Sequence, residues 1–300
     1  KRSSLQMEKL VGLEPMGRPD VAAGHSLIAG KYKTKSPDLV TDCNVCIKQC
    51  KEHQVSLKIW SIPPDNIRMF SFCDGAHDPE GERHQVGWIN GCSNQYLNDN
   101  RNAPCSILGW RSRKLPRKAG SPQLVETYAA SYAVADMNWL RCLLLSMFWS
   151  DFDILKQRPR HFKPVSNSPV VMRTDRPEVK DPDGSLFTDS KGTYDACNNE
   201  LPQDDKKCAV ETPIIQELLR RMNGRLRWLP HNRNPSDGLT KLKGAHLLPL
   251  LNLMQTGFFH MKMEENELQE RQDVKTAIGS IPRHKQQFQS PSACYNSLVV

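Results

Sequence analysis

The sequence predicts a mixed α/β (α+β) fold, in which a five-stranded mixed sheet is flanked by helices and preceded by a small helical segment. Three β-prone apolar segments with polar loops between them come first, which is typical of an antiparallel meander. A long helical pattern follows them. Two later strands then alternate with helices, as in parallel βα units. The strands are expected at residues 66–74, 85–92, 105–112, 185–188 and 224–230.

Helices are expected before, between and after these strands. Pro19 or Asp20 is a suitable first residue for the first helix, because both types are favoured in a first helical turn. Ser121 followed by Pro122 marks the start of the long helix after the third strand. A short helix follows the fourth strand. The longer candidate helices span residues 18–32, 36–53, 121–149, 206–222 and 235–259, the last of them broken near its proline at 249.

The chain divides into three predicted regions. Residues 1–65 form a small, mostly helical segment, and residues 66–261 form the domain that contains the sheet. A proline-rich, charged stretch at about 151–184 is expected to be an insertion in that domain. Residues 262–300 are polar and rich in Gln, Ser and Glu, a composition that predicts a disordered tail.

Composition and charge narrow the class of protein. Three hundred residues can bury a sizeable core. The net charge of +8 favours a polyanionic partner such as nucleic acid. The most apolar stretch, 139–149, is too short to cross a membrane and contains Arg141, so no membrane partner is expected.

The cell compartment is predicted from the same composition. No secretory signal is seen in residues 1–20, so the protein is expected in the cytoplasm or nucleus, with its ten cysteines reduced. The first residue is Lys1 and not Met, so we expect a fragment or a processed piece of a longer protein.

Four acids lie at the ends of predicted elements. Asp74 ends the first strand, Asp189 ends the fourth, and Asp237 opens the last helix. Glu126 lies on the apolar stripe of the long helix, where an unpaired carboxylate is costly unless a cation or a proton neutralises it. Four converging carboxylates would suit Mg²⁺ or Mn²⁺ better than zinc, and two such ions can promote phosphodiester hydrolysis. Each acid alone also fits a turn, a helix edge or a helix first turn.

Two further groups of side chains have alternative interpretations. A cluster of cations follows Trp110 and could contact phosphates, or it could simply be solvated. It consists of Arg111, Arg113, Lys114, Arg117 and Lys118. Cys43, Cys46, Cys50 and His53 fall on one continuous helical face, which favours a packing stripe over a zinc site, because zinc ligands need a turn between them.

Four segments in succession resemble the ribonuclease H domain of copia-type retrotransposon Pol polyproteins. They are "FSFCDGAHDPEGERHQVGWI", "GWRSRKLPRKAGSPQLVETYAAS", "LFTDSKGTYDAC" and "RLRWLPHNRNPSDGLTK". Upstream, "GRPDVAAGHSLIAG" is similar to a helix near the end of the reverse transcriptase region of that family. The resemblance covers about residues 15–260, and it identifies residues 1–65 as the helical end of the reverse transcriptase or connection segment.

The resemblance implies a function and a set of residues for it. The activity would be two-metal hydrolysis of the RNA strand of RNA–DNA hybrids, with Asp74, Glu126, Asp189 and Asp237 as the catalytic, metal-ligating acids. Two Mg²⁺ ions would serve, with Mn²⁺ as a substitute, and Asp74 would bridge them. His231 would assist product or proton release, although a loop histidine can also be merely solvated. The partners would be the hybrid and the rest of the Pol polyprotein, including the reverse transcriptase core, in a virus-like particle in the cytoplasm or in the nucleus.

Three departures from the family pattern leave an alternative open. The gap between Glu126 and Asp189 is longer than a compact domain of this family needs, "SDGLTK" replaces the commoner "ADxLTK", and no "YxDD" polymerase signature is present. The alternative is a catalytically decayed retrotransposon remnant that acts at most as a nucleic-acid-binding module.

Overall fold

A computed structural model of the chain describes residues 17–33, 38–78, 84–148, 152–153, 158–159, 181–198, 205–241 and 245–279. The chain divides into two units, residues 1–264 and 265–300, and each is described by itself. All strands in the described residues, and all four predicted acids, belong to the first unit. In the part of the chain that the structure describes, no helix has the length and apolar character to cross a membrane.

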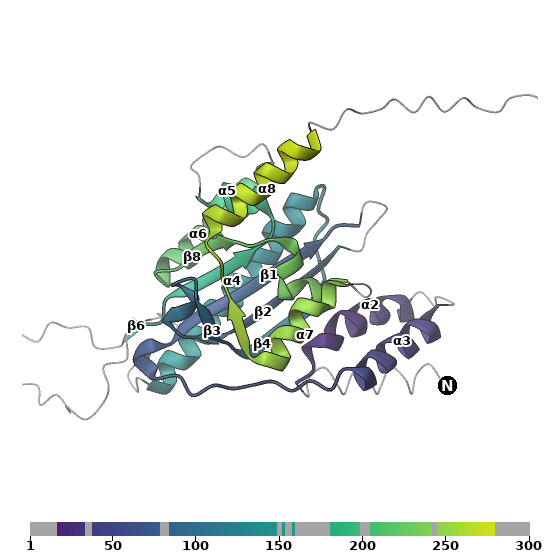
Figure 1. The fold of residues 1–300 in the computed structure, drawn as a ribbon, viewed down its shortest axis with the longest axis horizontal. Helices are drawn as coiled ribbons and strands as arrows, with labels where there is room; N and C mark the ends of the chain where they lie inside the picture. Colours follow the sequence, from purple (N-terminus) through teal and green to yellow (C-terminus); the bar gives the residue numbers. More distant parts are fainter. Residues whose placement is uncertain are drawn as a thin grey trace, which may run out of the picture. The chain divides into compact units, whose positions relative to one another are not determined.

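The five predicted strands pair into one mixed sheet (Figure 1). Its order is β4-β2-β1-β7-β8, with β1 antiparallel to β2, β2 antiparallel to β4, and β1, β7 and β8 mutually parallel. The bounds are Arg68–Ala76 for β1, Gln85–Ser93 for β2, Ser106–Lys114 for β4, Gly184–Thr188 for β7 and Arg225–Trp228 for β8. The predicted fold class is therefore confirmed.

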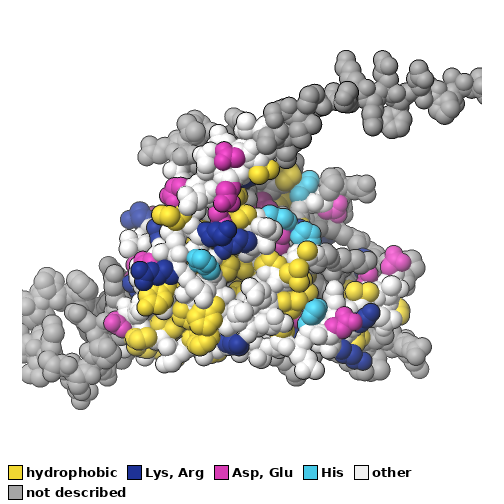
Figure 2. Space-filling view, in the orientation of Figure 1, with side chains coloured by type: hydrophobic (Ala, Val, Ile, Leu, Met, Phe, Trp, Pro, Cys, Tyr) yellow, Lys and Arg dark blue, Asp and Glu magenta, His cyan; other side chains and the backbone are white. Residues whose placement is uncertain are grey.

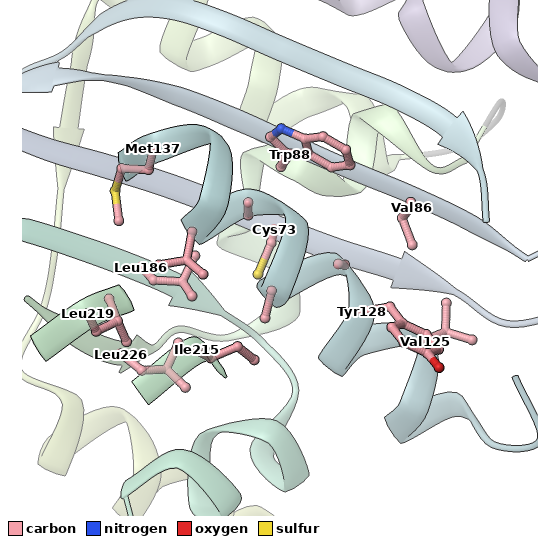
Figure 3. Packing of buried hydrophobic residues seen from close by; sticks show 14 of the residues in the cluster. Cys73, Val86, Trp88, Val125, Tyr128, Met137, Leu186, Ile215, Leu219 and Leu226 are labelled. Atoms are coloured by element: carbon pink, nitrogen blue, oxygen red, sulfur yellow. The ribbon is translucent and has the colours of Figure 1, made fainter. Parts of the chain in front are cut away.

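Alternate residues of β1 face two separate layers of core, because successive side chains of a strand point to opposite faces. Met69 and Cys73 join the core cluster that contains the helices α4 (Pro122–Phe148) and α6 (Lys206–Arg221). Figure 3 shows this layer, with Cys73 and Trp88 on the sheet side. Phe70 and Phe72 join the cluster on the opposite face. With both faces covered, β1 lies in the interior of the unit.

The long helix α4 approaches the sheet closely where its buried face carries small residues. Ala129, Ala130 and Ala133 are fully buried against the sheet layer. A Cβ atom on Gly75 of β1 would lie 2.9 Å from backbone atoms of Val125. Gly75 and these alanines together allow the backbone of α4 to pack directly against β1.

The prediction of one terminal helix over residues 235–259 is wrong. The segment is divided into the short 3-10 helices η5 (Pro235–Leu239) and η6 (Ala245–Leu247), the helix α7 (Leu248–Thr256) and the strand β9 (Phe258–His260). Pro249 lies in the first turn of α7 and so begins a helix where a break was expected. Gly257, with φ 69°, ends α7 in the left-handed conformation. The chain then turns into β9, which pairs with β3 (Asn102–Pro104).

The N-terminal segment contains the two predicted helices. They are α2 (Ala22–Lys33), preceded by the 3-10 turn η1 (Pro19–Val21), and α3 (Leu39–Glu52). Cys43 and Cys46 are buried in one cluster with Ile28 and Leu39, as expected for a packing stripe. Cys50 is only partly buried, and His53 follows the end of α3 in an extended conformation, so the predicted face does not include it. The described cysteines are free thiols.

The remaining elements of the described residues are short. They are η2 (Pro64–Asn66), η3 (Gln95–Leu97), η4 (His231–Arg233), α5 (Lys191–Asn198) and the paired short strands β5 (Phe152–Asp153) and β6 (Arg158–Pro159). Most of the predicted insertion at 151–184 lies outside the described residues.

The predicted disorder of the tail is wrong for its first part. Residues Glu264–Gly279 form the helix α8. Its Glu, Gln, Arg and Lys residues are good helix formers even though their composition is polar. Gln269 also donates a hydrogen bond to Asp273 one turn later. Residues 280–300 lie outside the described part of the chain.

Candidate active site

The carboxyl ends of the parallel strands β1 and β7 bring two of the predicted acids together. Phe72 of β1 pairs with Phe187 of β7, and Asp74 and Asp189 each follow two residues later. Asp237, from η5, completes a group of three. Carboxylate oxygens of Asp74, Asp189 and Asp237 all lie within 4.8 Å of one another.

The fourth predicted acid, Glu126, reaches the same place from α4. Its Oε2 accepts a hydrogen bond from the backbone N–H of Gly75, at 2.9 Å. Burial raises the pKa of Glu126 well above its ordinary value, and the charges of Asp74 and Asp189 raise it further. The structure therefore brings all four acids together at one edge of the sheet.

The electrostatics of this cluster favour the binding of positive charge. Burial and then the charge of Asp189 raise the pKa of Asp74. Burial and then the charge of Asp74 raise the pKa of Asp237 to about 8. Like charges in a shared buried site oppose one another's ionisation. A cation among these carboxylates would remove that penalty.

Lys241 supplies part of the missing positive charge. Its Nζ lies 2.9 Å from Asp237 Oδ1 and 3.8 Å from Asp74 Oδ2. Burial lowers the pKa of Lys241, but the carboxylates of Asp74 and Asp237 raise it more, so its pKa is raised overall. One lysine is fewer than four acids require.

His231 lies between two of the acids. Its Nδ1 is 2.6 Å from Asp189 Oδ2, and its Nε2 is 3.1 Å from Asp237 Oδ2. The hydrogen bond with Asp189 is the main cause that raises the pKa of His231, against the effect of burial. The side chain is 53% exposed, so it can exchange protons with solvent.

Four further residues contact the acids without having been singled out in the sequence. Thr240 donates a hydrogen bond to Asp74 Oδ2, and Asn234 donates one to Asp189 Oδ1 at 3.3 Å. Lys241 and Thr240 both lie inside the "SDGLTK" motif, which was the available signal for them. Asn234 precedes a proline, a helix-capping signal, and its side chain caps η5. His246, whose Nδ1 is 3.3 Å from Asp237 Oδ2, had no signal in the sequence.

The predicted basic cluster lies on the edge strand β4 and the loop after it, with β2 between β4 and β1. Its members differ in their surroundings. Arg113 lies over the ring of Tyr132 at 4.3 Å, and Arg117 forms an ion pair of 3.0 Å with Glu211. Arg111 and Lys114 are exposed on the strand, and Lys118 is exposed in the loop.

The donor set fits the ion that the sequence predicted. Carboxylate oxygens from several elements, sharing one buried space, are the ligands that Mg²⁺ and Mn²⁺ prefer. Asp74, Asp189 and Asp237 would hold such an ion, with Glu126 beside them.

A cleft adjoins the cluster. Its volume is about 570 Å³, and it is lined by residues of η4, η6, α7 and β9 together with Asp237. His231 and His246 belong to its wall, and Phe258 and Phe259 provide apolar surface. Figure 2 shows histidine side chains next to one another, close to hydrophobic ones, on the face that it draws.

Comparisons with known proteins give likenesses in structure only. No protein-family model and no curated protein matches the chain. An RNase H1 from the halophilic archaeon Halobacterium salinarum is 14% identical, with 56% of this chain and 90% of that chain covered and a TM-score of 0.35. The N-terminal RNase H domain of a Mycobacterium tuberculosis protein is 10% identical, with 62% and 96% covered and a TM-score of 0.36. LC11-RNase H1, solved in complex with an RNA/DNA hybrid, is 10% identical, with 57% and 93% covered and a TM-score of 0.35.

The fold and the site together define a mixed α/β protein with a buried carboxylate cluster at the end of its central strands. The activity named for the three proteins above is a property of those proteins.

Proposed function

We propose that this chain is a metal-dependent ribonuclease H that hydrolyses the RNA strand of RNA–DNA hybrids, as part of a copia-type Pol polyprotein. The observation that carries the proposal is the carboxylate cluster of Asp74, Asp189 and Asp237, with Glu126 beside it through its hydrogen bond from the Gly75 N–H. The order of the four motifs in the sequence supports the same family. In this proposal the chain works beside the reverse transcriptase core, in the cytoplasm or nucleus.

The four acids would hold the metal ions, Mg²⁺ or its substitute Mn²⁺. When bound, a pair of such ions supplies an activated water and stabilises the leaving oxygen of a phosphodiester. Asp74 is the central acid, because it is 1% exposed and contributes to the raised pKa of both Glu126 and Asp237. Thr240 and Asn234 would keep the carboxylates of Asp74 and Asp189 oriented through their hydrogen bonds.

His231 would manage protons at the edge of the site. It contacts Asp189 and Asp237, it is half exposed, and its hydrogen bond with Asp189 raises its pKa, which favours the protonated ring that would give a proton to a product oxygen.

The test is cleavage of a labelled RNA–DNA hybrid by the full chain in Mg²⁺. Asp74→Asn and Asp189→Asn should each lower the cleavage rate by about 10²-fold or more, because each removes a ligand from metal chemistry worth several kcal/mol. Asp65→Asn is the control, since this exposed acid precedes β1 and so lies at the other end of that strand. If the unmodified chain binds the hybrid and leaves it intact, the decayed, binding-only alternative replaces this proposal.

Recognition of the substrate would use phosphates and groove shape, with no reading of base sequence. Arg111 and Lys114 are the members of the basic cluster best placed for phosphate contact, because they are exposed on β4. Arg113 lies over the ring of Tyr132, and Arg117 contacts the ring of Tyr128 and pairs with Glu211. Replacing either arginine would therefore disturb the fold as well.

Arg111→Ala and Lys114→Ala should weaken hybrid binding and lower the slope of log affinity against log salt by about 1 for each phosphate that the variant no longer binds. The measurement is a binding titration at several salt concentrations, with Arg220→Ala as the control at the end of α6. Slopes equal to that of the unmodified chain would remove β4 from the interface.

A further inference from the structure

We propose that His231, Asp237 and His246 form a second kind of metal site, one that takes a transition metal of the Zn²⁺ class. It goes beyond the proposed hydrolysis, whose metal ions would be held by the four acids. The two sites share one ligand, Asp237, and His231 adjoins both.

The distances around Asp237 Oδ2 are those between ligands of one ion. This oxygen lies 3.1 Å from His231 Nε2 and 3.3 Å from His246 Nδ1, and one ligand atom from each of the three residues lies within 4.8 Å of the others. A tetrahedral ion with bonds of about 2.0–2.1 Å separates its ligands by about 3.3–3.4 Å. Small side-chain adjustments would be enough to seat an ion.

The donor atoms of this triad favour a different metal from the one that the neighbouring carboxylates favour. Two imidazole nitrogens and one carboxylate oxygen suit zinc and similar ions, whereas Asp74, Asp189 and Asp237 offer oxygen alone. Three protein ligands leave a fourth position for water or a ligand. Here that position can face the cleft of about 570 Å³, because all three residues line it.

Asp189 orients His231 for this role. His231 Nδ1 lies 2.6 Å from Asp189 Oδ2 and can donate its proton there, as the second nitrogen of a metal-bound histidine commonly does. His231 Nε2 then faces Asp237 Oδ2, at 3.1 Å.

The access to the site is also suitable. The Asp237 side chain is 1% exposed, whereas those of His231 and His246 are 53% and 38% exposed. The two imidazole rings lie close, with centroids 5.4 Å apart. An ion could enter from solvent between the histidines and reach the buried carboxylate.

The experiment is a titration of the metal-free full chain with Co²⁺, followed by visible absorption, and then competition with Zn²⁺. We expect one Co²⁺ per chain with the intense visible bands of tetrahedral cobalt, no thiolate-to-cobalt charge-transfer absorption, and displacement by Zn²⁺. His246→Gln should weaken Co²⁺ binding by about tenfold or more. His260→Ala is the matched control, because this histidine lines the same cleft and is not a member of the triad.

Loss of Co²⁺ binding in His246→Gln could also result from misfolding, so a second variant that gains a signal is needed. His246→Cys should keep Co²⁺ binding and add thiolate-to-cobalt charge transfer, which only a ligand at this position can produce. The proposal is overturned if His246→Gln binds Co²⁺ as the unmodified chain does, if His260→Ala loses binding equally, or if His246→Cys shows no charge-transfer band.

The two proposals fail separately. Hydrolysis of the hybrid in Mg²⁺ without Co²⁺ binding refutes only the transition-metal site. Tight Co²⁺ binding with the triad signature, in a chain that leaves the hybrid intact, refutes only the proposed nuclease.

Discussion

At the scale of single residues, Asp237 connects every part of the site. It contacts Lys241, His231 and His246, and it lies with Asp74 and Asp189 in the carboxylate group. It is also 1% exposed, so its charge is poorly solvated. Its ionisation should therefore be visible in the stability of the whole unit.

The pH dependence follows from the sign of the shift. The pKa of Asp237 rises from 3.8 to about 8, so between these values the folded chain holds a proton that the unfolded chain has released. Stability must then fall as pH rises through this window. Without divalent ions, the melting temperature should drop between pH 5 and pH 8, and Mg²⁺ should restore more of it at pH 8.

Asp237→Asn tests this directly in a series of thermal melts in chelator. The variant should melt at least about 2 °C higher than the unmodified chain at pH 8. Its melting temperature should also fall less between pH 5 and pH 8 than that of the unmodified chain. Asp65→Asn, at an exposed acid, should leave the pH profile unchanged. A profile for Asp237→Asn that is as steep as that of the unmodified chain would contradict the explanation.

At the scale of elements, the closeness of β1 and α4 is what places Glu126 beside Asp74. Gly75 contributes to this closeness in two ways. Its backbone N–H donates a hydrogen bond to Glu126, and its lack of a side chain leaves room for the backbone of α4. The alanines of α4 continue the same close packing along the sheet. The position of Glu126 thus depends on a glycine and on alanines, which have no reactive side-chain groups.

Gly75→Ala should break this arrangement. The new methyl group would lie 2.9 Å from the backbone of Val125 and Glu126, and overpacking of this kind costs about 1–3 kcal/mol. We expect a lower melting temperature and loss of hybrid cleavage together. Gly120→Ala, just before α4, meets open space and should melt no lower than the unmodified chain. Equal melting of the two variants would show that the helix can move away at little cost.

At the scale of the whole molecule, residues far apart in sequence are joined through the buried Arg227. Its guanidinium donates to Leu97 O at 3.1 Å and to Glu264 Oε2 at 3.1 Å. Glu264 also accepts a hydrogen bond from the Trp228 N–H at 2.7 Å. The end of the first unit is therefore tied to β8 and to η3, the 3-10 helix after β2.

Glu264→Ala should destabilise the first unit. The Arg227 side chain is 3% exposed, and breaking a buried ion pair costs about 3–5 kcal/mol because a charge is left without its partner. The hydrogen bond to Leu97 makes the lower end of that range the expected value. Chemical denaturation followed by far-ultraviolet circular dichroism measures it, with Glu265→Ala, at the exposed neighbour, as the control. Indistinguishable midpoints would mean that Arg227 finds another partner.

Local patterns in the sequence were enough for the five strands and for the start of α4 at Pro122. These signals are local, because burial of one face sets the hydrophobic period and a cap depends on its immediate neighbours. The four acids were also visible as candidates, but only the family resemblance joined them into one set. Tertiary structure alone decided that His246 reaches Asp237, that residues 235–259 break into short pieces, and that β9 pairs with β3. These outcomes depend on which distant segments meet, and no short stretch of sequence encodes that, because the free energy comes from packing between elements.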